Sequence, residues 1–140
     1  MTHPNGLFSW ADVAQADPAA GAEFYNAVFG WEAAQGSPDE SMPYWMFSKD
    51  GKVAAGMGGL SPDQVEQGIP PVWSSYINVD DVDDTVVRAK ELGASVVMPA
   101  MQVFTFGKMA FIQDPQGAMV GLWQPMEHTG ADEFNTPGFM

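Results

Sequence analysis

The chain has 140 residues, of which 46% are hydrophobic and 16% charged, so it is long enough to bury a core and does not have the composition of a disordered chain. Eighteen acidic residues oppose five basic ones, and the net charge of −13 disfavours nucleic acids and anionic membrane surfaces as partners. There is no cysteine, so disulfides and thiolate metal sites are excluded. No apolar run approaches the roughly 20 residues of a membrane span. The first residues lack the basic and apolar regions of a secretory signal, so we expect a cytoplasmic protein.

The first part of the chain predicts a strand over residues 7–14, followed by a helix. Asp17 and Pro18 suit the N-cap and first position of that helix, and Gly30 suits its C-terminal end. Its apolar face is expected to hold residues spaced by four together with two neighbours: Ala20, Phe24, Val28, Tyr25 and Phe29. A short strand over 31–35, a polar loop over 36–43 and a hairpin over 44–60 follow.

The second part repeats this order after a linker over residues 61–71. A strand over 72–79 precedes a helix that Asp81 caps and Gly93 ends. Its core-facing residues are expected to be Val82, Val86, Ala89 and Leu92. A strand over 95–103 and a hairpin over 107–125 come next, and residues 125–140 are expected to form a tail.

The two hairpins resemble each other in sequence. Asp50-Gly51 is typical of a two-residue hairpin turn, and Asp114-Pro115-Gln116-Gly117 suits a type I turn. Phe47 matches Phe111 at a separation of 64 residues, whereas Gly56 matches Gly121 at 65, which we interpret as a second turn that is one residue longer. The first strands match as well, because Asp12 and Tyr76 are also 64 residues apart.

Each half therefore reads as strand, helix and three strands. We expect an α+β fold in which two βαβββ modules form an eight-stranded, partly open barrel around a cleft, with the helices outside. As a single domain over residues 1–140, it would comprise module 1 (about 7–60), the linker (61–71), module 2 (about 72–124) and the tail (125–140).

In this arrangement the chain resembles the vicinal oxygen chelate superfamily, also called the glyoxalase/bleomycin-resistance/dioxygenase fold, and in particular a glyoxalase-like bacterial branch. The residues that carry the resemblance are Asp17-Pro18, Phe24-Tyr25, Val28 to Trp31, Val79 to Val82, Leu92 to Ala94, Asp114 to Gly117 and Leu122 to Gln124. Metal-dependent members place His, Glu or Gln ligands on the first, fourth, fifth and eighth strands.

Carrying that pattern over gives positions that ligate poorly: Trp10 or Asp12, Gly56 or Met57, Ser74, and Gly121. Glycine and tryptophan cannot ligate, and one carboxylate is too few for a site that needs three or four ligands. The two histidines, His3 and His128, lie outside both repeats and are expected to be solvated. We therefore predict no metal and no cofactor.

The resemblance instead implies an apolar, aromatic and methionine-rich cleft for a small molecule. The predicted ligand-binding residues are Trp10, Asp12, Phe47, Met57, Ser74, Tyr76, Met109, Phe111, Gly121 and Trp123. The alternative is that these side chains fill the interior as ordinary core.

Catalysis stays open at this point. Asp12 is a candidate general base and Tyr76 a candidate proton donor. The alternatives to a metal-free binding protein are a lyase, isomerase or dioxygenase-type enzyme, metal-free through Asp12 or with an atypical metal site, and an assembly role such as a homodimer.

Overall fold

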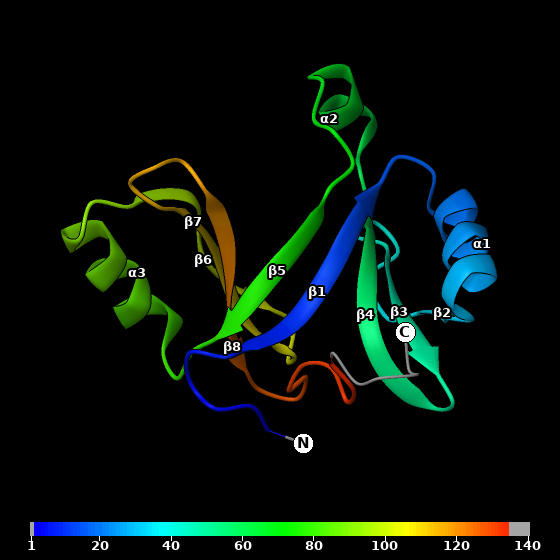
Figure 1. Cartoon of the computed structure of the whole chain (residues 1–140). Coiled ribbons are helices and arrows are strands. Elements are labelled where there is room, and N and C mark those ends of the chain that lie inside the picture. Colours follow the sequence, from blue (N-terminus) through cyan, green and yellow to red (C-terminus); the bar gives the residue numbers. More distant parts are fainter. Residues whose placement is uncertain (1, 135–140) are drawn as a thin grey trace. The chain divides into compact units, whose positions relative to one another are not determined.

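The computed structural model describes residues 2–134, which contain eight strands and three helices (Figure 1). The elements are β1 (Phe8–Gln15), α1 (Pro18–Phe29), β2 (Glu32–Gln35), β3 (Tyr44–Lys49), β4 (Lys52–Gly59), α2 (Pro62–Glu66), β5 (Trp73–Asn78), α3 (Val82–Glu91), β6 (Ser95–Val103), β7 (Gly107–Gln113) and β8 (Met119–Pro125). The expected α+β class with two βαβββ repeats is confirmed.

The strands follow the order β2-β3-β4-β1-β5-β8-β7-β6 in a mixed sheet. In each repeat the first strand pairs in parallel with the fourth, β1 with β4 and β5 with β8. The pairs β2–β3, β3–β4, β6–β7 and β7–β8 are antiparallel. Among residues 2–134, no helix has the length and apolar character needed to cross a lipid bilayer.

The chain divides into two compact units. Of the described residues, unit 1 contains 2–10 and Ser74–Gly130, and unit 2 contains Ala11–Trp73 and 131–134. The first strand therefore begins in unit 1, where Leu7 accepts a backbone hydrogen bond from Asn78, and continues in unit 2.

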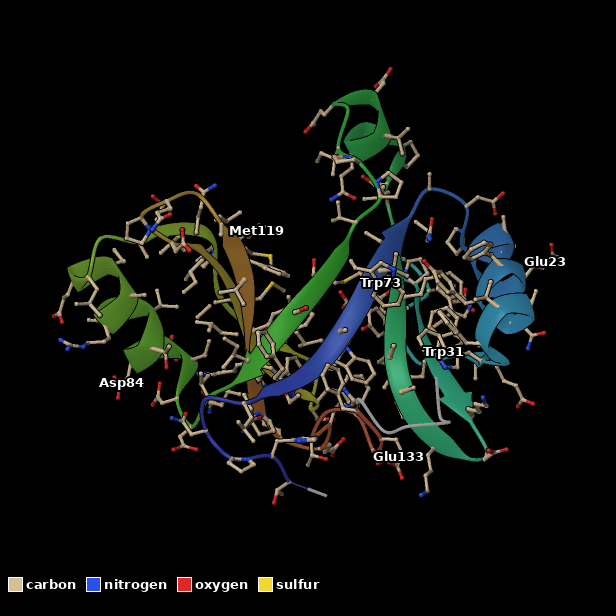
Figure 2. All side chains as sticks on the ribbon, viewed as in Figure 1. Glu23, Trp31, Trp73, Asp84, Met119 and Glu133 are labelled. Carbon is tan, nitrogen blue, oxygen red and sulfur yellow. The ribbon has the colours of Figure 1, made fainter. Side chains whose placement is uncertain are left out.

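In unit 2 the helix α1 covers a core built mainly from aromatic side chains. The Asp17 cap accepts the Ala20 N–H at 3.1 Å, and Gly30 ends the helix with a φ of 75°, as the sequence predicts. Tyr25, Phe29 and Trp31 pack with the fully buried Phe47. Figure 2 shows Trp31 and Trp73 beside α1, and the Trp73 Nε1–H donates to the Tyr25 hydroxyl at 3.0 Å.

The prediction of which face of α1 packs on the sheet is wrong, because the helix is rotated about its axis by part of a turn. Phe24 is 58% exposed and Val28 is also exposed, whereas Gly21 is buried against the sheet. A Cβ at position 21 would lie 3.0 Å from the Met57 Sδ. The missing side chain lets the helix approach the sheet there, so the helix turns Gly21 and Tyr25, rather than Phe24, toward the core.

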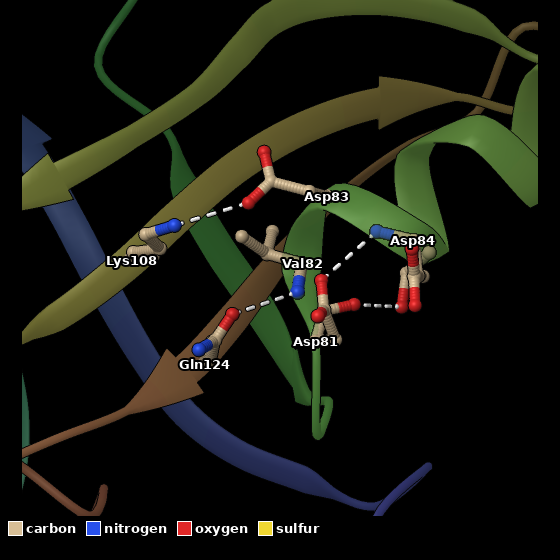
Figure 3. Close-up of polar contacts among 7 residues, drawn as sticks. Asp81, Val82, Asp83, Asp84, Lys108 and Gln124 are labelled. Atoms are coloured by element: carbon tan, nitrogen blue, oxygen red, sulfur yellow. Dashed lines mark hydrogen bonds and ion pairs between the residues drawn. The ribbon is translucent and has the colours of Figure 1, made fainter.

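In unit 1 the helix α3 covers the second half of the sheet through Val82 and Val86, which pack with Ala110 and Leu122. Asp81 caps the helix by accepting the Asp84 N–H at 3.0 Å (Figure 3). The Gln124 side chain accepts the Val82 N–H, and Lys108 forms an ion pair with Asp83 at 3.0 Å. Leu92, expected in the core, is exposed because it lies at the C-cap, past the last turn that faces the sheet.

The segments expected to be linker and tail contain ordered structure. The 61–71 segment begins with the short helix α2, whose first turn has a capping box between Ser61 and Gln64. In unit 1, His128 donates its backbone N–H to the Phe106 carbonyl. In unit 2, Asp132 exchanges hydrogen bonds with Val53 in β4. The last residues of the expected tail, 135–140, lie outside the described residues.

The strand registers show that one of the residue matches predicted between the two hairpins is wrong. Gly56 lies opposite Met46 and Asp12, and Gly121 lies opposite Phe111 and Tyr76, so the two glycines are equivalent as predicted. Phe111 therefore corresponds to Met46, and Phe47 corresponds to Ile112 instead of Phe111. The cause is a β-bulge at Ala54 in β4, where the register shifts between Phe47 and Ser48. A shift of one residue moves a side chain to the opposite face of a sheet.

Candidate functional site

Side chains alternate between the two faces of each strand, so the helix-packed faces also define the helix-free faces. In unit 1, Ala110 and Leu122 pack toward α3, which turns their sequence neighbours Phe111, Gly121 and Trp123 to the other face. The register adds further residues to this face: Met98 opposite Phe111, Met101 opposite Met109, and Tyr76 opposite Gly121. We call it the methionine-aromatic face. Met119 joins it two residues before Gly121, and Ser74 two residues before Tyr76.

Tyr76 fills the space above Gly121. A Cβ at position 121 would lie 2.5 Å from the Tyr76 Cδ2, which no real side chain tolerates without movement. The Tyr76 ring is buried, and it packs against Phe111 with centroids 5.3 Å apart at an angle of 55°. Gly121 therefore makes room for an aromatic ring of the protein itself, and the half-buried Phe111 is the ring that a ligand on this face would contact.

Trp10 and Trp123 belong to a second aromatic group of unit 1, which His128 completes. The His128 imidazole lies edge-on to Trp10 at 4.4 Å and to Trp123 at 5.7 Å between ring centroids. The Trp123 Nε1–H donates to the His128 carbonyl at 2.8 Å. The expectation that His128 is a solvated terminal residue is wrong, because the segment after β8 returns to the sheet and packs the ring between two tryptophans.

In unit 2 the helix-free face carries a polar pair. Asp12 lies opposite Gly56 in the β1–β4 register, and the Tyr44 hydroxyl donates to its Oδ2 at 2.9 Å. Tyr44 lies opposite Gly58, and a Cβ there would meet the tyrosine ring at 3.7 Å. The two glycines leave this part of the sheet without side chains of their own, so Tyr44 can cross the strand to reach Asp12.

Phe47 and Met57, both predicted to bind ligand, lie on the opposite face of the same sheet. Both are fully buried in the core beneath α1, Phe47 against Tyr25 and Trp31, and Met57 beside Gly21. Because their contacts are with the helix, we leave them out of the candidate site.

The residues at the predicted metal positions do not fit a metal ion. Gly56 and Gly121 have no ligating atoms, and Tyr76 covers Gly121. Within residues 2–134, no group of three or more His, Cys, Asp and Glu side chains is arranged to hold one. A divalent ion in a protein usually needs three or four such ligands.

Some residues of these two faces were missed in the sequence: Tyr44, Met46, Met98, Met101 and His128. The bulge in β4 places Met46, rather than Phe47, at the position that corresponds to Phe111. Met98 and Met101 are three residues apart yet share a face, because β6 has a register shift between them. Only cross-strand pairing discloses such a shift.

Two βαβββ repeats, each with a parallel pair of first and fourth strands, define an α+β protein built from paired modules. The sequence profile described as Glyoxalase/Bleomycin resistance protein/Dioxygenase superfamily matches residues 7–122, and the chain belongs to that superfamily. The predicted resemblance is thereby confirmed.

Among its relatives, a protein named Putative glyoxylase CFP32 from Mycobacterium bovis is 39% identical over 138 residues, covering 95% of this chain and 51% of that protein. Anthracycline biosynthesis protein DnrV from Streptomyces peucetius is 33% identical over 143 residues, covering 95% and 52%. The chain spans about half the length of these curated relatives.

Solved structures share the fold at low sequence identity. Methylmalonyl-CoA epimerase from Mycobacterium tuberculosis superposes with a TM-score of 0.62 at 18% identity, over 89% of this chain and 93% of that one. Hypothetical protein BH1468 from Bacillus halodurans C-125 gives a TM-score of 0.66 at 12% identity, over 89% and 97%.

Proposed function

We propose that this superfamily member is a metal-free protein that binds a small, largely apolar or aromatic molecule on the methionine-aromatic face of unit 1. The observation that carries the proposal is the gathering of Tyr76, Phe111 and several methionines on a face that no helix covers. Aromatic rings offer flat surfaces for stacking, and flexible thioethers adapt to the outline of a ligand.

The chemistry of the face favours a flat, weakly polar ligand. Ser74 and Asn78 are the neutral polar residues that share it with Tyr76 on β5, and the Asn78 side-chain amide donates to the His3 carbonyl at 2.6 Å. No charged side chain is among the residues that define the face, so a strongly anionic ligand would lack a counter-charge. The net charge of −13 would also repel it.

The names of two relatives agree with a small-molecule ligand. One is an anthracycline biosynthesis protein, and anthracyclines contain planar fused rings; another is a putative glyoxylase. Since the chain spans about half of each, their activities enter here only as a guide to the choice of probes.

Titration with doxorubicin, a planar anthracycline, tests the proposal by quenching of tryptophan fluorescence. We expect saturable binding that Phe111→Ala weakens about tenfold, because truncating an aromatic contact costs about 1 kcal/mol or more. Leu92→Ala, which removes an exposed apolar side chain at the end of α3, is the matched control and should bind like the wild type. Absence of saturable binding by doxorubicin and by naphthalene, or an equal loss in both variants, would contradict the proposal.

A second candidate is an enzyme that uses Asp12 as a general base, and the hydrogen bond from Tyr44 favours it because it orients the carboxylate. Proton exchange next to a carbonyl, followed by NMR in D₂O with an uncharged thioester, would test it. Asp12→Asn should abolish the exchange. The homodimer and the cytoplasmic location stay predictions, which light scattering and fractionation can test.

A further inference from the structure

The methionine-aromatic face of unit 1 contains four thioethers. Met98 and Met101 come from β6, Met109 from β7 and Met119 from β8, where Met119 lies opposite Gln113. The chain has ten methionines, so this face holds a large share of them. All four share a face with Tyr76 and Phe111, and the proposed ligand would contact the half-buried Phe111 ring.

Two of these four side chains are open to solvent. Met119 is 51% exposed and Met101 is 39% exposed, whereas Met98 and Met109 are half-buried. Figure 2 shows Met119 near the start of β8, at the rim of the sheet. By contrast, Met57 in the core of unit 2 is fully buried. A dissolved oxidant can therefore reach the first two sulfurs directly and the core sulfur only after unfolding.

We propose that Met101 and Met119 are sites of reversible oxidation by peroxides and that their oxidation releases the ligand. A sulfur lone pair attacks one peroxide oxygen, the O–O bond breaks and an S–O bond forms, and the second oxygen leaves as water. The sulfur loses two electrons and the peroxide gains them. Methionine sulfoxide reductases reverse the step with a thiol reductant.

The consequence for binding follows from polarity, and it rests on the proposed function. A sulfoxide places a strong hydrogen-bond acceptor on a face that otherwise offers rings and thioethers. Covering that oxygen with an apolar ligand removes it from water without giving it a partner. We expect the dissociation constant for an apolar aromatic probe to rise about tenfold when both residues are oxidised.

Met42 is the matched control. It is 53% exposed, as open as Met119, but it lies in the loop between β2 and β3 of unit 2. Peroxide should oxidise it as readily as Met119 without changing affinity. Leucine replacements at 42, 101 and 119 conserve volume and cannot be oxidised.

The experiment treats the protein with a limited dose of hydrogen peroxide, locates the sulfoxides by peptide mass spectrometry and titrates naphthalene, an apolar aromatic probe, before and after. The ratio of the two dissociation constants is compared within each variant. We expect a ratio of about ten for the wild type and for Met42→Leu. It should be near one for the Met101→Leu/Met119→Leu double variant, and methionine sulfoxide reductase should restore binding to the oxidised wild type.

Three outcomes would overturn the inference. Oxidation of Met57 before Met101 and Met119 contradicts the exposure argument. A ratio of dissociation constants near one in the wild type, with both residues oxidised, contradicts the effect on binding while leaving the proposed function intact. Absence of binding before any peroxide is added contradicts the proposed function itself, and the inference falls with it.

Discussion

In unit 1 the position opposite Gly121 holds Tyr76, whereas in unit 2 the equivalent position opposite Gly56 holds Asp12. Tyr76 lays its ring over the glycine and packs against Phe111, so the face becomes apolar. Asp12 instead accepts a hydrogen bond from the hydroxyl of Tyr44, which crosses from β3. The same strand pairing thus supports an aromatic surface in one unit and a polar pair in the other. The scaffold fixes where side chains stand, and residue type decides which chemistry they offer.

The two hairpins differ in the register of their strands. β7 and β8 keep a continuous register, whereas β4 contains the bulge at Ala54. Phe111 therefore lies on the helix-free face and Phe47 lies in the core beneath α1. Two phenylalanines that match in sequence therefore lie on opposite faces of the sheet, one on the helix-free face and one in the core.

The largest expected effect separates these two phenylalanines. Phe47→Ala should lower the free energy of unfolding by about 3–5 kcal/mol, because it empties a fully buried site. Phe111→Ala should cost clearly less in stability, since its ring is half-buried, but should weaken binding of the aromatic probe. Urea denaturation with fluorescence titration measures both. Equal losses of stability would mean that the two positions are equivalent after all.

The paired glycines give the next effect. Gly121→Ala should destabilise by about 1–3 kcal/mol, because the new Cβ would overlap the buried Tyr76 ring. Gly58→Ala is the matched control in unit 2, since its Cβ would make an ordinary contact with Tyr44 at 3.7 Å. The measurement is the urea midpoint of each variant. A Gly121→Ala protein as stable as the Gly58→Ala protein would contradict the packing of Tyr76 over Gly121.

The Tyr44–Asp12 hydrogen bond should have a smaller effect. Tyr44→Phe removes the donor and should lower stability by about 1 kcal/mol, the usual net contribution of a partly buried hydrogen bond. A double-mutant cycle with Asp12→Ala isolates the pair. A coupling energy indistinguishable from zero would show that the polar pair does not contribute to stability.

The smallest effect concerns the contact of residue 133 with β4. The hydrogen bond and the charge of Glu133 raise the pKa of Lys52 above its ordinary value. The stabilisation that this ion pair contributes is therefore complete below the pKa of Lys52 in the unfolded chain. It is lost as the pH rises through the pKa of Lys52 in the folded protein. Glu133→Gln should return the pKa of Lys52 toward the ordinary value in an NMR titration of the lysine side chain. A titration curve that does not move would rule out the ion pair in solution. The pair is solvent-exposed, so its loss should hardly change stability.

Much of the fold could be predicted because its signals are local. Asp17, Gly30 and Asp81 mark helix ends, and Asp50 and Gly51 both adopt the positive φ of a tight hairpin turn. The equivalence of Gly56 with Gly121 also followed from the repeat. Periodicity failed where contacts decide orientation: it placed Phe24 and Leu92 inside, and both are exposed.

The sequence by itself determined the family, the order of the elements and the residue types at the family's metal positions, because caps, turns and residue types are properties of a few neighbouring positions. The tertiary structure alone decided which face each side chain occupies. The bulge at Ala54 moved Phe47 into the core, the close approach at Gly21 turned α1, and the return of the chain after β8 brought His128 against Trp10 and Trp123. Each depends on contacts between residues distant in sequence, and a shift of one residue in a strand reverses every side chain beyond it.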